Sequence, residues 1–300
     1  MAWKGLHLSR PARLSVSDNQ IVVEQDDSEV RLALEDVAYV ILDVPHATLT
    51  SSLIAACMEA GVVIISVDVR HTPIGVTLPF HSHHKQAGVA AKQISLGEPF
   101  KKRCWQRIVV AKINNQAAHL ESLNKNAEAL RALAKRVNSG DPNNIEAQAA
   151  RDYWRTLFTG FTRDSANDLR NKIMNYGYAV ARSGVARALV AYGLLPAFGL
   201  HHASATNAFN LADDLLEPFR PFVDAIAALR TNDRDKSEDL TVDDRRAMAG
   251  MLLADARVGA EKVSLLVATE KSAQSLVQAI DASSAELLQL PVFVAPKRSP

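Results

Sequence analysis

The sequence predicts an α+β protein with a small β-rich, β-sandwich-like N-terminal domain and a larger all-α domain after it. Short β-branched runs separated by turn residues fill the first part of the chain, and after Phe80 the apolar residues follow a helical period. A chain of 300 residues is also long enough for two cores. We therefore expect a β-rich domain at 1–80, a linker helix at 81–98 and a helical domain at 99–300.

Local signals define the elements of the β-rich part. Ser17-Asp18-Asn19-Gln20 lies between two β-branched runs and predicts a hairpin turn. Thr48 or Thr50 can cap a short helix, and Gly61 can end it. The remaining strands are predicted at Val37 to Leu42, at Val62 to Val67 and, after a turn, within 73–80.

Glycine and proline divide the helical part. The breaks are expected at Gly97-Glu98-Pro99 and at Gly140-Asp141-Pro142, so one long helical stretch lies between them. Further helices are predicted at 144–158, 164–192, 206–229, 241–256 and 261–288.

The composition is that of an ordinary globular protein, with 48% hydrophobic and 22% charged residues. No apolar run reaches the length of a membrane span, and MAWKGLHLSR lacks the apolar block of a signal peptide. Cys57 and Cys104 lie in predicted helices without a C-x-x-C partner, which predicts buried free thiols. We expect a cytoplasmic protein that does not enter a membrane.

Charge is distributed unevenly along the chain. Residues 1–84 carry 5 Lys and Arg against 10 Asp and Glu, whereas residues 85–115 carry 7 Lys and Arg against Glu98 alone. Such a basic segment is typical either of a patch that binds a polyanion or of a solvated helix face.

Glu146 is the first residue with an unusual position. Asn143 or Asn144 can cap its helix, and a carboxylate in the first turn is favoured by the helix dipole. Glu146 also shares a stripe with Tyr153 and Trp154, so it lies on the buried edge of the helix. A carboxylate on that edge needs a cation or a hydrogen-bond donor.

The stretch GLHHASATNAFNLADDLLEPFRP, residues 199–221, combines two histidines with an acidic helix. It predicts either a metal site or a loop followed by a capped helix. Pro218 and Pro221 force an end or a kink after Glu217, which can turn that carboxylate inward. The possible ligands here are His201, His202, Asp213, Asp214 and Glu217.

Three segments occur in a characteristic order: IEAQAARDYW, then LRNKIMNYGYAVARSGVARALVAYGLLPAFGLHH, then NLADDLLEPFRPFVD. With VVIISVDVRHTPIGVTLPFHSH and EPFKKRCWQRIVVAKINNQA, they resemble the CRISPR-associated spacer-acquisition integrase, also described as the adaptation endonuclease. The resemblance covers almost the whole chain. The short chain and its EPFRP sequence resemble the type II branch, which accompanies a single-protein RNA-guided nuclease.

The resemblance implies a divalent metal site of Glu, His and Glu or Asp. The matching positions are Glu146, His202 and Glu217, where the histidine stands three residues after Gly199. His201 is extra to the motif, and which of the two imidazoles faces the metal is left open. Asp213 and Asp214 are possible outer or auxiliary ligands. Such a site suits Mg²⁺ or Mn²⁺.

The implied activity is metal-dependent phosphodiester transfer on DNA. In this family a 3′-hydroxyl of a captured foreign fragment attacks a CRISPR repeat boundary, as part of antiviral defence, and water as nucleophile would make the same site a nuclease. Two alternatives are a metal-dependent DNA nuclease of repair or recombination and a noncatalytic DNA-bridging scaffold of the same fold.

The implied partners are double-stranded DNA, a second copy of the chain that binds through the β-rich domain, a small ferredoxin-like CRISPR-associated protein and the RNA-guided effector nuclease. Expected phosphate contacts are Lys101, Lys102, Arg103, Arg107, Lys112, Arg151, Arg163 and Arg170. A rival metal cluster, His81, His83 and His84, is assigned mainly to the linker and its interface.

Overall fold

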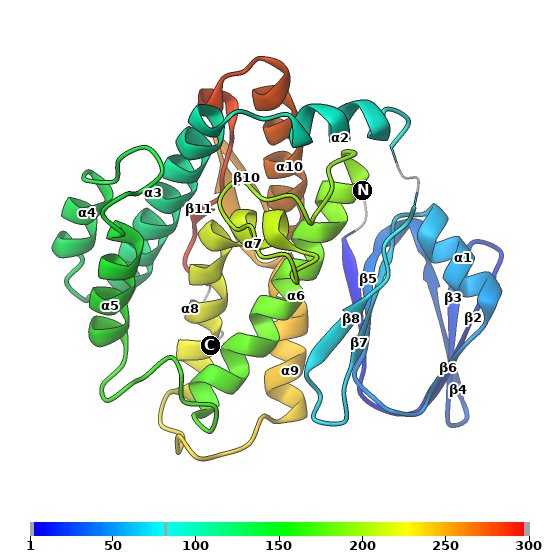
Figure 1. Ribbon diagram of the computed structural model, residues 1–300. Helices are drawn as coiled ribbons and strands as arrows, with labels where there is room; N and C mark the ends of the chain where they lie inside the picture. Colours follow the sequence, from blue (N-terminus) through cyan, green and yellow to red (C-terminus); the bar gives the residue numbers. More distant parts are fainter. Residues whose placement is uncertain (1–2, 81–82, 297–300) are drawn as a thin grey trace.

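The computed structural model describes residues 3–80 and 83–296, and it confirms a β-rich N-terminal part followed by a helical part (Figure 1). In the β-rich part, one mixed sheet has the strand order β1-β5-β7-β8 and a second has the order β4-β3-β2-β6. The first consists of β1 (Lys4–Leu8), β5 (Val37–Leu42), β7 (Val63–Val67) and β8 (Pro73–Val76), and the second of β4 (Ser28–Ala33), β3 (Gln20–Gln25), β2 (Ala12–Ser17) and β6 (Ala47–Leu49).

The predicted turns of this part are confirmed. Asp18 and Asn19 both have positive φ, as a tight hairpin between β2 and β3 requires. Helix α1 (Ser51–Glu59) begins after Thr50, whose side chain accepts a hydrogen bond from the backbone N–H of Leu53, so Thr50 rather than Thr48 is the cap. Gly61 follows that helix with a φ of +69°.

The β1-β5-β7-β8 sheet has two buried faces. Val40 and Ile64 point into a small core shared with the other sheet and α1, whereas Tyr39 and Ile65 join the large core of the helical part. The Tyr39 hydroxyl donates a 2.6 Å hydrogen bond to the carbonyl of Ala249. The sheet therefore links the two cores, which explains its continuous apolar strands.

The helical part surrounds α6, most of which is buried (Figure 1). Helices α7, α8, α9 and α10 all contact it, and α3 packs against α4, α5 and α8. The helices are α2 (Gln86–Ile94), α3 (Glu98–Ser122), α4 (Glu128–Ala134), α5 (Ile145–Leu157), α6 (Leu169–Ala191), α7 (Asn210–Leu216), α8 (Arg220–Thr231), α9 (Val242–Ala249) and α10 (Leu265–Asp281).

Five segments differ from the helices predicted for them. The helix expected at 241–256 ends at Ala249 and is followed by a 3₁₀ turn and a strand, and the helix expected at 261–288 begins only at Leu265, after a strand, and ends at Asp281. Residues 206–229 do not form one helix, because Pro218 lies in a 3₁₀ turn, Glu217–Phe219, between α7 and α8. The helix expected from residue 164 begins only at Leu169, after the Asp168 cap. The helix expected from 99 to 139 ends at Ser122, and α4 follows as a separate helix.

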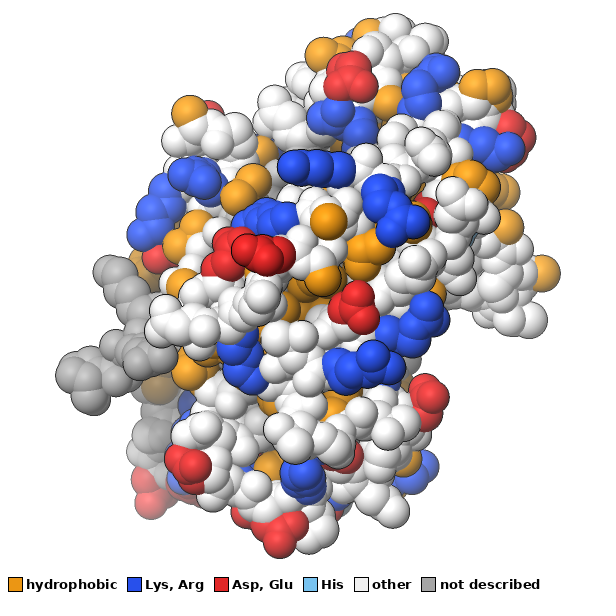
Figure 2. Space-filling view, turned by 90° about the vertical axis from the view of Figure 1, so that its left-hand side faces the viewer, with side chains coloured by type: hydrophobic (Ala, Val, Ile, Leu, Met, Phe, Trp, Pro, Cys, Tyr) orange, Lys and Arg blue, Asp and Glu red, His pale blue; other side chains and the backbone are white. Residues whose placement is uncertain are grey.

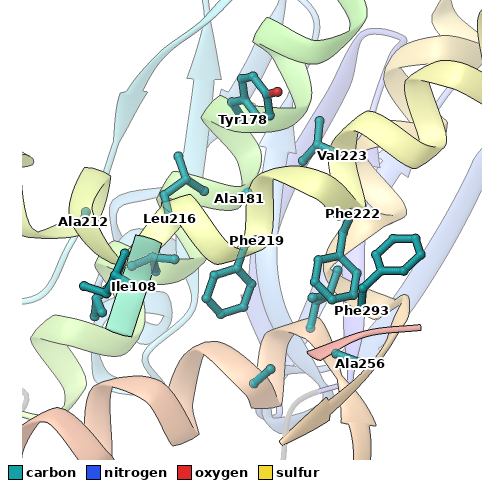
Figure 3. Packing of buried hydrophobic residues seen from close by; sticks show 14 of the residues in the cluster. Ile108, Tyr178, Ala181, Ala212, Leu216, Phe219, Phe222, Val223, Ala256 and Phe293 are labelled. Carbon is teal, nitrogen blue, oxygen red and sulfur yellow. The ribbon is translucent and has the colours of Figure 1, made fainter. Parts of the chain in front are cut away.

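The helical part also contains a small sheet that was not predicted. Strands β9 (Asp255–Val258), β10 (Glu261–Ser264) and β11 (Val292–Phe293) form a three-stranded sheet in the order β10-β9-β11. Gly259, with a φ of +59°, makes the turn between β9 and β10. Phe293 of β11 packs against Phe222 of α8, with ring centroids 5.1 Å apart (Figure 3).

Within residues 3–80 and 83–296, no helix is both long and apolar enough to cross a membrane. Cys57 and Cys104 are free, buried and helical, as expected. Burial raises the pKa of the Cys57 thiol to about 11 and that of Cys104 to about 12, so neither is a reactive thiolate.

Candidate active site

Two of the predicted ligands, Glu146 and Glu217, converge on one cation. Glu146 Oε1 lies 2.6 Å and Glu217 Oε2 lies 2.5 Å from Nζ of Lys112. The three side chains come from the start of α5, the end of α7 and the middle of α3. A position between two carboxylates that already holds a positive charge has the donor set of a cation site.

The first turn of α5 holds Glu146 in place. Asn144 adopts a φ of +49°, and its side chain caps the backbone N–H of Ala147. The carboxylate of Asp141 accepts hydrogen bonds of 2.9 Å from the backbone N–H groups of Ile145 and Glu146. The predicted cap is confirmed, with Asn144 rather than Asn143 in that role. Capping from two side chains makes this helix start rigid.

A proline turn and a buried asparagine determine the position of Glu217. Pro218 follows Glu217 directly, and the Pro218 carbonyl accepts a 2.8 Å hydrogen bond from the side chain of Asn115. Asn115 also contacts the carbonyl of Pro291 and the backbone N–H of Phe293. Since Asn115 lies one turn after Lys112 on α3, one helix supports both the cation and the turn that carries Glu217.

The carboxylate of Glu217 is buried and strongly paired. Its side chain is 6% exposed, and Arg220 Nε lies 2.7 Å from Oε1. Burial opposes ionisation, but Arg220 and Lys112 lower the pKa of Glu217 to about 2. Burial would lower the pKa of Lys112, yet Glu217 and Glu146 raise it above its usual value. Glu217 and Lys112 are therefore both charged at neutral pH.

The two adjacent histidines have different environments. The ring of His201 stacks on Trp105, with centroids 4.0 Å apart and planes 2° apart. The Nδ1 of His202 instead lies 2.6 Å from Oδ1 of Asp214. A histidine whose Nδ1 is held by a carboxylate presents Nε2 in a defined direction, as metal-ligating histidines do.

Asp214 organises the loop that carries both histidines. Its side chain is fully buried, and its oxygens accept hydrogen bonds from the backbone N–H groups of Leu200, His201 and His202. The hydrogen bond between His202 and Asp214 is the main cause of the raised pKa of the His202 imidazole. The negative charge of Glu217 raises that pKa further. Because the oxygens of Asp214 already accept these hydrogen bonds, Asp214 is better suited to orient His202 than to bind a metal ion directly.

Gly199 has a steric reason to be glycine. A Cβ atom at this position would lie 2.2 Å from the carbonyl of His202 and 2.8 Å from Asp214. The histidine loop can thus fold back on itself only with glycine three residues before His202. Asp213, by contrast, points toward Asn207 at 2.8 Å and Arg182 at 3.8 Å.

The side chains of Glu146, Glu217 and His202 are suitable in type to bind a divalent cation, but their arrangement is only partly suitable. Two carboxylates converge and one imidazole lies in the electric field of Glu217, which is a donor set suited to Mg²⁺ or Mn²⁺. Among the residues that the structure describes, however, no group of three His, Cys, Asp or Glu side chains is close enough to bind one metal ion. Lys112 occupies the position between the carboxylates.

The expected phosphate contacts are not equally available. Lys102, Arg103 and Arg151 are exposed, but the side chain of Lys112 is 10% exposed between two carboxylates. This burial contradicts its expected role as a surface contact. Arg170 is also buried, because its guanidinium is paired with Asp168, and the same correction applies.

The basic segment is partly neutralised by tertiary contacts. Arg107 lies 2.5 Å from Glu286, Lys92 lies 2.6 Å from Asp281, and Lys101 is 3.5 Å from Glu98. Figure 2 shows the face that carries α4 and α5, where Lys and Arg side chains are spread among Asp and Glu. The local excess in the sequence does not become a uniform basic field.

The structure describes two of the three histidines of the rival metal cluster, His83 and His84. His81 lies outside the described residues, and the rings of His83 and His84 are 4.9 Å apart. A nitrogen of His83 accepts the backbone N–H of Lys85 at the start of α2, and its ring lies close to Gly193. The first contact is local to the linker, and the second joins the linker to the end of α6.

Sequence reasoning missed the residues that surround Glu217. Arg220 could have been found, because it stands three residues after Glu217 across a proline turn, where side chains face each other. Asn115 gave no signal of this kind, since its partners are distant in sequence. Asp141 was passed over because it stands before Pro142, outside the helix whose first N–H groups it caps.

Comparison with known proteins identifies relatives. A family model described as "CRISPR associated protein Cas1" matches residues 6–258. A CRISPR-associated endonuclease Cas1 of Neisseria meningitidis is 37% identical over 295 residues, which cover 97% of this chain and 96% of the relative. A CRISPR-associated endonuclease Cas1 of Saccharolobus solfataricus is 25% identical over 92% of this chain and 90% of the relative.

Solved structures share the fold. A casposase bound to its integration product has a TM-score of 0.74 at 16% identity, over 95% of this chain and 92% of that one. A CAS1 protein from Thermotoga maritima has a TM-score of 0.71 at 16% identity, over 98% and 100% of the two chains. A Cas6-RT-Cas1–Cas2 complex matches with a TM-score of 0.72 at 20% identity, over 96% of this chain and 36% of that one.

Proposed function

Because the chain belongs to the Cas1 family of CRISPR-associated proteins, we propose that it is a metal-dependent DNA integrase and endonuclease. It inserts short foreign DNA fragments into a CRISPR array. The 37% identity to the Neisseria protein over nearly the full length of both chains supports a place in the type II branch. The observation that carries the chemistry is the convergence of Glu146 and Glu217 on one cation position.

Glu146, His202 and Glu217 would hold the ion, either Mg²⁺ or Mn²⁺. When bound, such an ion stabilises the charge that develops on phosphodiester oxygens during transfer. Arg220 holds one oxygen of Glu217, which leaves the other directed toward the cation position. Asp214 holds Nδ1 of His202 and so directs Nε2.

The reaction is a transesterification. The 3′-hydroxyl of the fragment forms a new bond to phosphorus at the repeat boundary, and the bond from that phosphorus to the 3′-oxygen of the array strand breaks. The number of phosphodiester bonds is unchanged, so no nucleotide cofactor is needed. With water as the nucleophile, the same site hydrolyses DNA.

Phosphate contacts away from the site are proposed for Lys101, Lys102, Arg103, Arg107, Arg151 and Arg163. The exposed pair Lys102 and Arg103 is the best test of this set. Reversing both charges should weaken DNA binding and reduce its salt dependence, since each lost phosphate contact removes part of the counterion release. An unchanged salt dependence would contradict the assignment.

We further propose a homodimer formed through the β-rich part, together with a small ferredoxin-like partner. The solved Cas6-RT-Cas1–Cas2 complex, in which the similar chain is assembled with Cas2, supports the proposal of a partner protein. An association with the RNA-guided effector nuclease is also part of the proposal.

The test is the joining of a labelled short duplex to a repeat-containing plasmid, with the small partner and Mn²⁺ or Mg²⁺. Wild type should join the ends, whereas Glu146→Gln, His202→Ala and Glu217→Gln should not. A wild-type protein that cuts but never joins would make it a nuclease of another process. Binding without any reaction would make it a scaffold.

A further inference from the structure

The segment that joins α6 to the candidate ligand His202 is held at both of its ends. At the far end, Asp214 accepts hydrogen bonds from the N–H groups of Leu200, His201 and His202. The near end, residues 193–198, lies outside the regular helices and strands. Such a segment keeps a side chain at a defined place only where other elements fix its backbone. The contacts of the near end therefore bear on the position of His202.

A glutamine of the linker helix makes three of these contacts. Gln93 of α2 is 4% exposed, and its amide nitrogen donates to the carbonyls of Leu195 and Phe198 at 2.9 and 2.8 Å. Its amide oxygen accepts a 2.9 Å hydrogen bond from the backbone N–H of Leu195. Both N–H donors of the amide are thus in use, together with one acceptor position. Three hydrogen bonds from one buried amide fix the orientation of this side chain.

The linker helix is itself attached to the helical part. Lys92, next to Gln93, lies 2.6 Å from Asp281 of α10. At the start of the linker, a Cβ atom at Gly193 would lie 2.9 Å from the ring of His83, so the segment passes directly beside that ring. The linker therefore contacts the segment at two points, and Gln93 acts from a fixed support.

The two holding points of the segment are adjacent along the chain. The Phe198 carbonyl, which Gln93 binds, and the first N–H group that Asp214 binds belong to consecutive peptide units. Since each peptide unit is planar, only the backbone angles of Gly199 lie between them. The surroundings of Gly199 are tight, because a Cβ atom there would lie 2.2 Å from the carbonyl of His202. A shift at Phe198 is therefore passed on to the histidine loop.

Gln93 should matter more for position than for stability. Phe198 is 49% exposed and Leu195 is half-buried, so water can reach this region once the glutamine amide is removed. The two carbonyls would then exchange one hydrogen-bond partner for another, which changes the free energy of unfolding little. The loss concerns the fixed geometry of the segment.

We propose that Gln93 is a positioning residue for His202. By holding the segment that precedes the histidine loop, Gln93 determines where the imidazole of His202 stands relative to Glu146 and Glu217. This inference rests on the proposed function, since it treats His202 as a ligand of the site. It adds the linker helix α2, which follows the β-rich part, to the elements that build the candidate active site.

Two substitutions of Gln93 test the proposal. Gln93→Met keeps the approximate size and the helix propensity of glutamine but removes all three hydrogen bonds. Gln93→Glu keeps an acceptor but places a carboxylate opposite the two carbonyls, so it should loosen the segment further. Lys92→Met is the matched control, because it changes the neighbouring residue of α2 and removes a surface ion pair that solvent screens. Circular dichroism and the unfolding temperature verify that each variant is folded.

Hydrogen exchange in EDTA measures the histidine loop without any metal or reaction. Mass spectrometry follows peptides that cover 194–204 and, for comparison, α5. In Gln93→Met, exchange within 194–204 should be about tenfold faster than in wild type, while exchange in α5 stays the same. Lys92→Met should match wild type in both peptides. Faster exchange in both peptides of Gln93→Met would indicate a loss of global stability, and unchanged exchange would indicate no effect on the loop. Either result would overturn the proposal.

The affinity for Mn²⁺ shows whether a loosened loop alters the ligand. Electron paramagnetic resonance of free Mn²⁺ gives the dissociation constant for wild type, Gln93→Met, Gln93→Glu and Lys92→Met. Gln93→Met should bind Mn²⁺ about tenfold more weakly than wild type, the lower end of the effect of losing a residue that orients a ligand. Lys92→Met should bind like wild type. Equal affinities of Gln93→Met and Lys92→Met would mean that Gln93 does not position His202.

The joining assay separates this inference from the proposed function. If wild type joins no ends although Gln93→Met weakens Mn²⁺ binding, the proposed reaction is wrong and the positioning role stands. If wild type joins ends and Gln93→Met equals it in Mn²⁺ affinity and in joining, the reaction stands and the positioning role is wrong. A high Mn²⁺ concentration should restore joining by Gln93→Met, since only the occupancy of the site is reduced.

Discussion

Asp43 and Glu217 are both buried carboxylates with cationic partners, but the charge around them is balanced differently. Asp43 accepts hydrogen bonds from His7 at 2.9 Å, from His71 at 2.6 Å and from Arg245 at 2.6 Å. Its side chain has no exposed surface, and it joins β1, the β7–β8 turn and α9. One acceptor with three donors forms a closed cluster between the two parts of the protein.

The cluster at Glu217 is open by comparison. Two carboxylates share the ammonium of Lys112, and the Glu146 side chain remains 25% exposed. Burial opposes ionisation of Asp43, and its three donors lower its pKa below the usual value, so Asp43 and Glu217 both stay charged. The difference teaches that pairing alone does not identify an active site. Carboxylates that converge on one position and remain accessible to solvent are a better indication of an active site.

The largest expected effect separates the two clusters by activity. Glu146→Gln or Glu217→Gln should reduce strand joining by about a thousandfold or more, because the metal contributes several kcal/mol to transition-state stabilisation. Asp43→Asn should join ends at a temperature where it is still folded. Joining rates at a fixed protein concentration, with circular dichroism to verify folding, provide the measurement. An active Glu217→Gln would remove Glu217 from the site.

Asp43 should matter for the free energy of unfolding, although it should not matter for strand joining. Asp43→Ala should lower the free energy of unfolding by about 3–5 kcal/mol, because it leaves buried Arg245 without its partner. Asp36→Ala removes a partly exposed pair with Lys4 and should cost much less, because solvent screens that pair. Urea denaturation measures both. Equal losses would mean that Asp43 does not hold the two parts together.

Lys112 offers a direct test of the cation position. In EDTA, Lys112→Met should unfold at a lower temperature than wild type, because Glu146 and Glu217 then repel each other without a counter-charge. Mn²⁺ should raise the unfolding temperature of this variant more than that of wild type, since no ammonium competes for the carboxylates. An equal rise in both proteins would show that metal and ammonium use different positions.

Asp224, which lies close to Arg220 of the Glu217 cluster, predicts a pH dependence of stability. Burial raises the pKa of its carboxyl to about 6, although Tyr178 and Tyr153 donate hydrogen bonds to it. The folded state therefore holds this proton more tightly, so the Asp224 contribution to stability is present below about pH 4 and is lost as pH rises to about 6. The stability of wild type relative to Asp224→Asn should fall over this range by up to about 3 kcal/mol.

Urea denaturation of both proteins between pH 4 and pH 8 measures this difference. A constant difference across the range would mean that Asp224 is ionised in the folded protein throughout.

The smallest effect should come from His201. His201→Ala removes a ring stacked on Trp105, which is worth about 0.5–1.5 kcal/mol of stability. Strand joining should change only severalfold, whereas His202→Ala should abolish it. A His201→Ala variant that is stable but inactive would exchange the roles of the two histidines.

The candidate site was proposed from two kinds of signal. Local signals single out Glu146, which follows a capping asparagine, and Glu217, which precedes a proline, whereas His202 was assigned from the family resemblance by its distance from Gly199. The contacts of Lys112 were not predictable, because the sequence of a helix with several lysines and arginines does not reveal which lysine meets two carboxylates from other segments. The strand Asp255–Val258 was missed because its four residues are too short to show a period.

The sequence by itself determined the order of the two parts, the start of α5 at Asn144 and the turn at Pro218, since these depend on backbone preferences of neighbouring residues. Only the tertiary structure decided which groups meet. The Lys112 cation between two carboxylates and the Asn115 side chain that binds the carbonyls of Pro218 and Pro291 each join segments distant in sequence. Their contacts follow from the packing of α3, α5, α6 and α8 around one core.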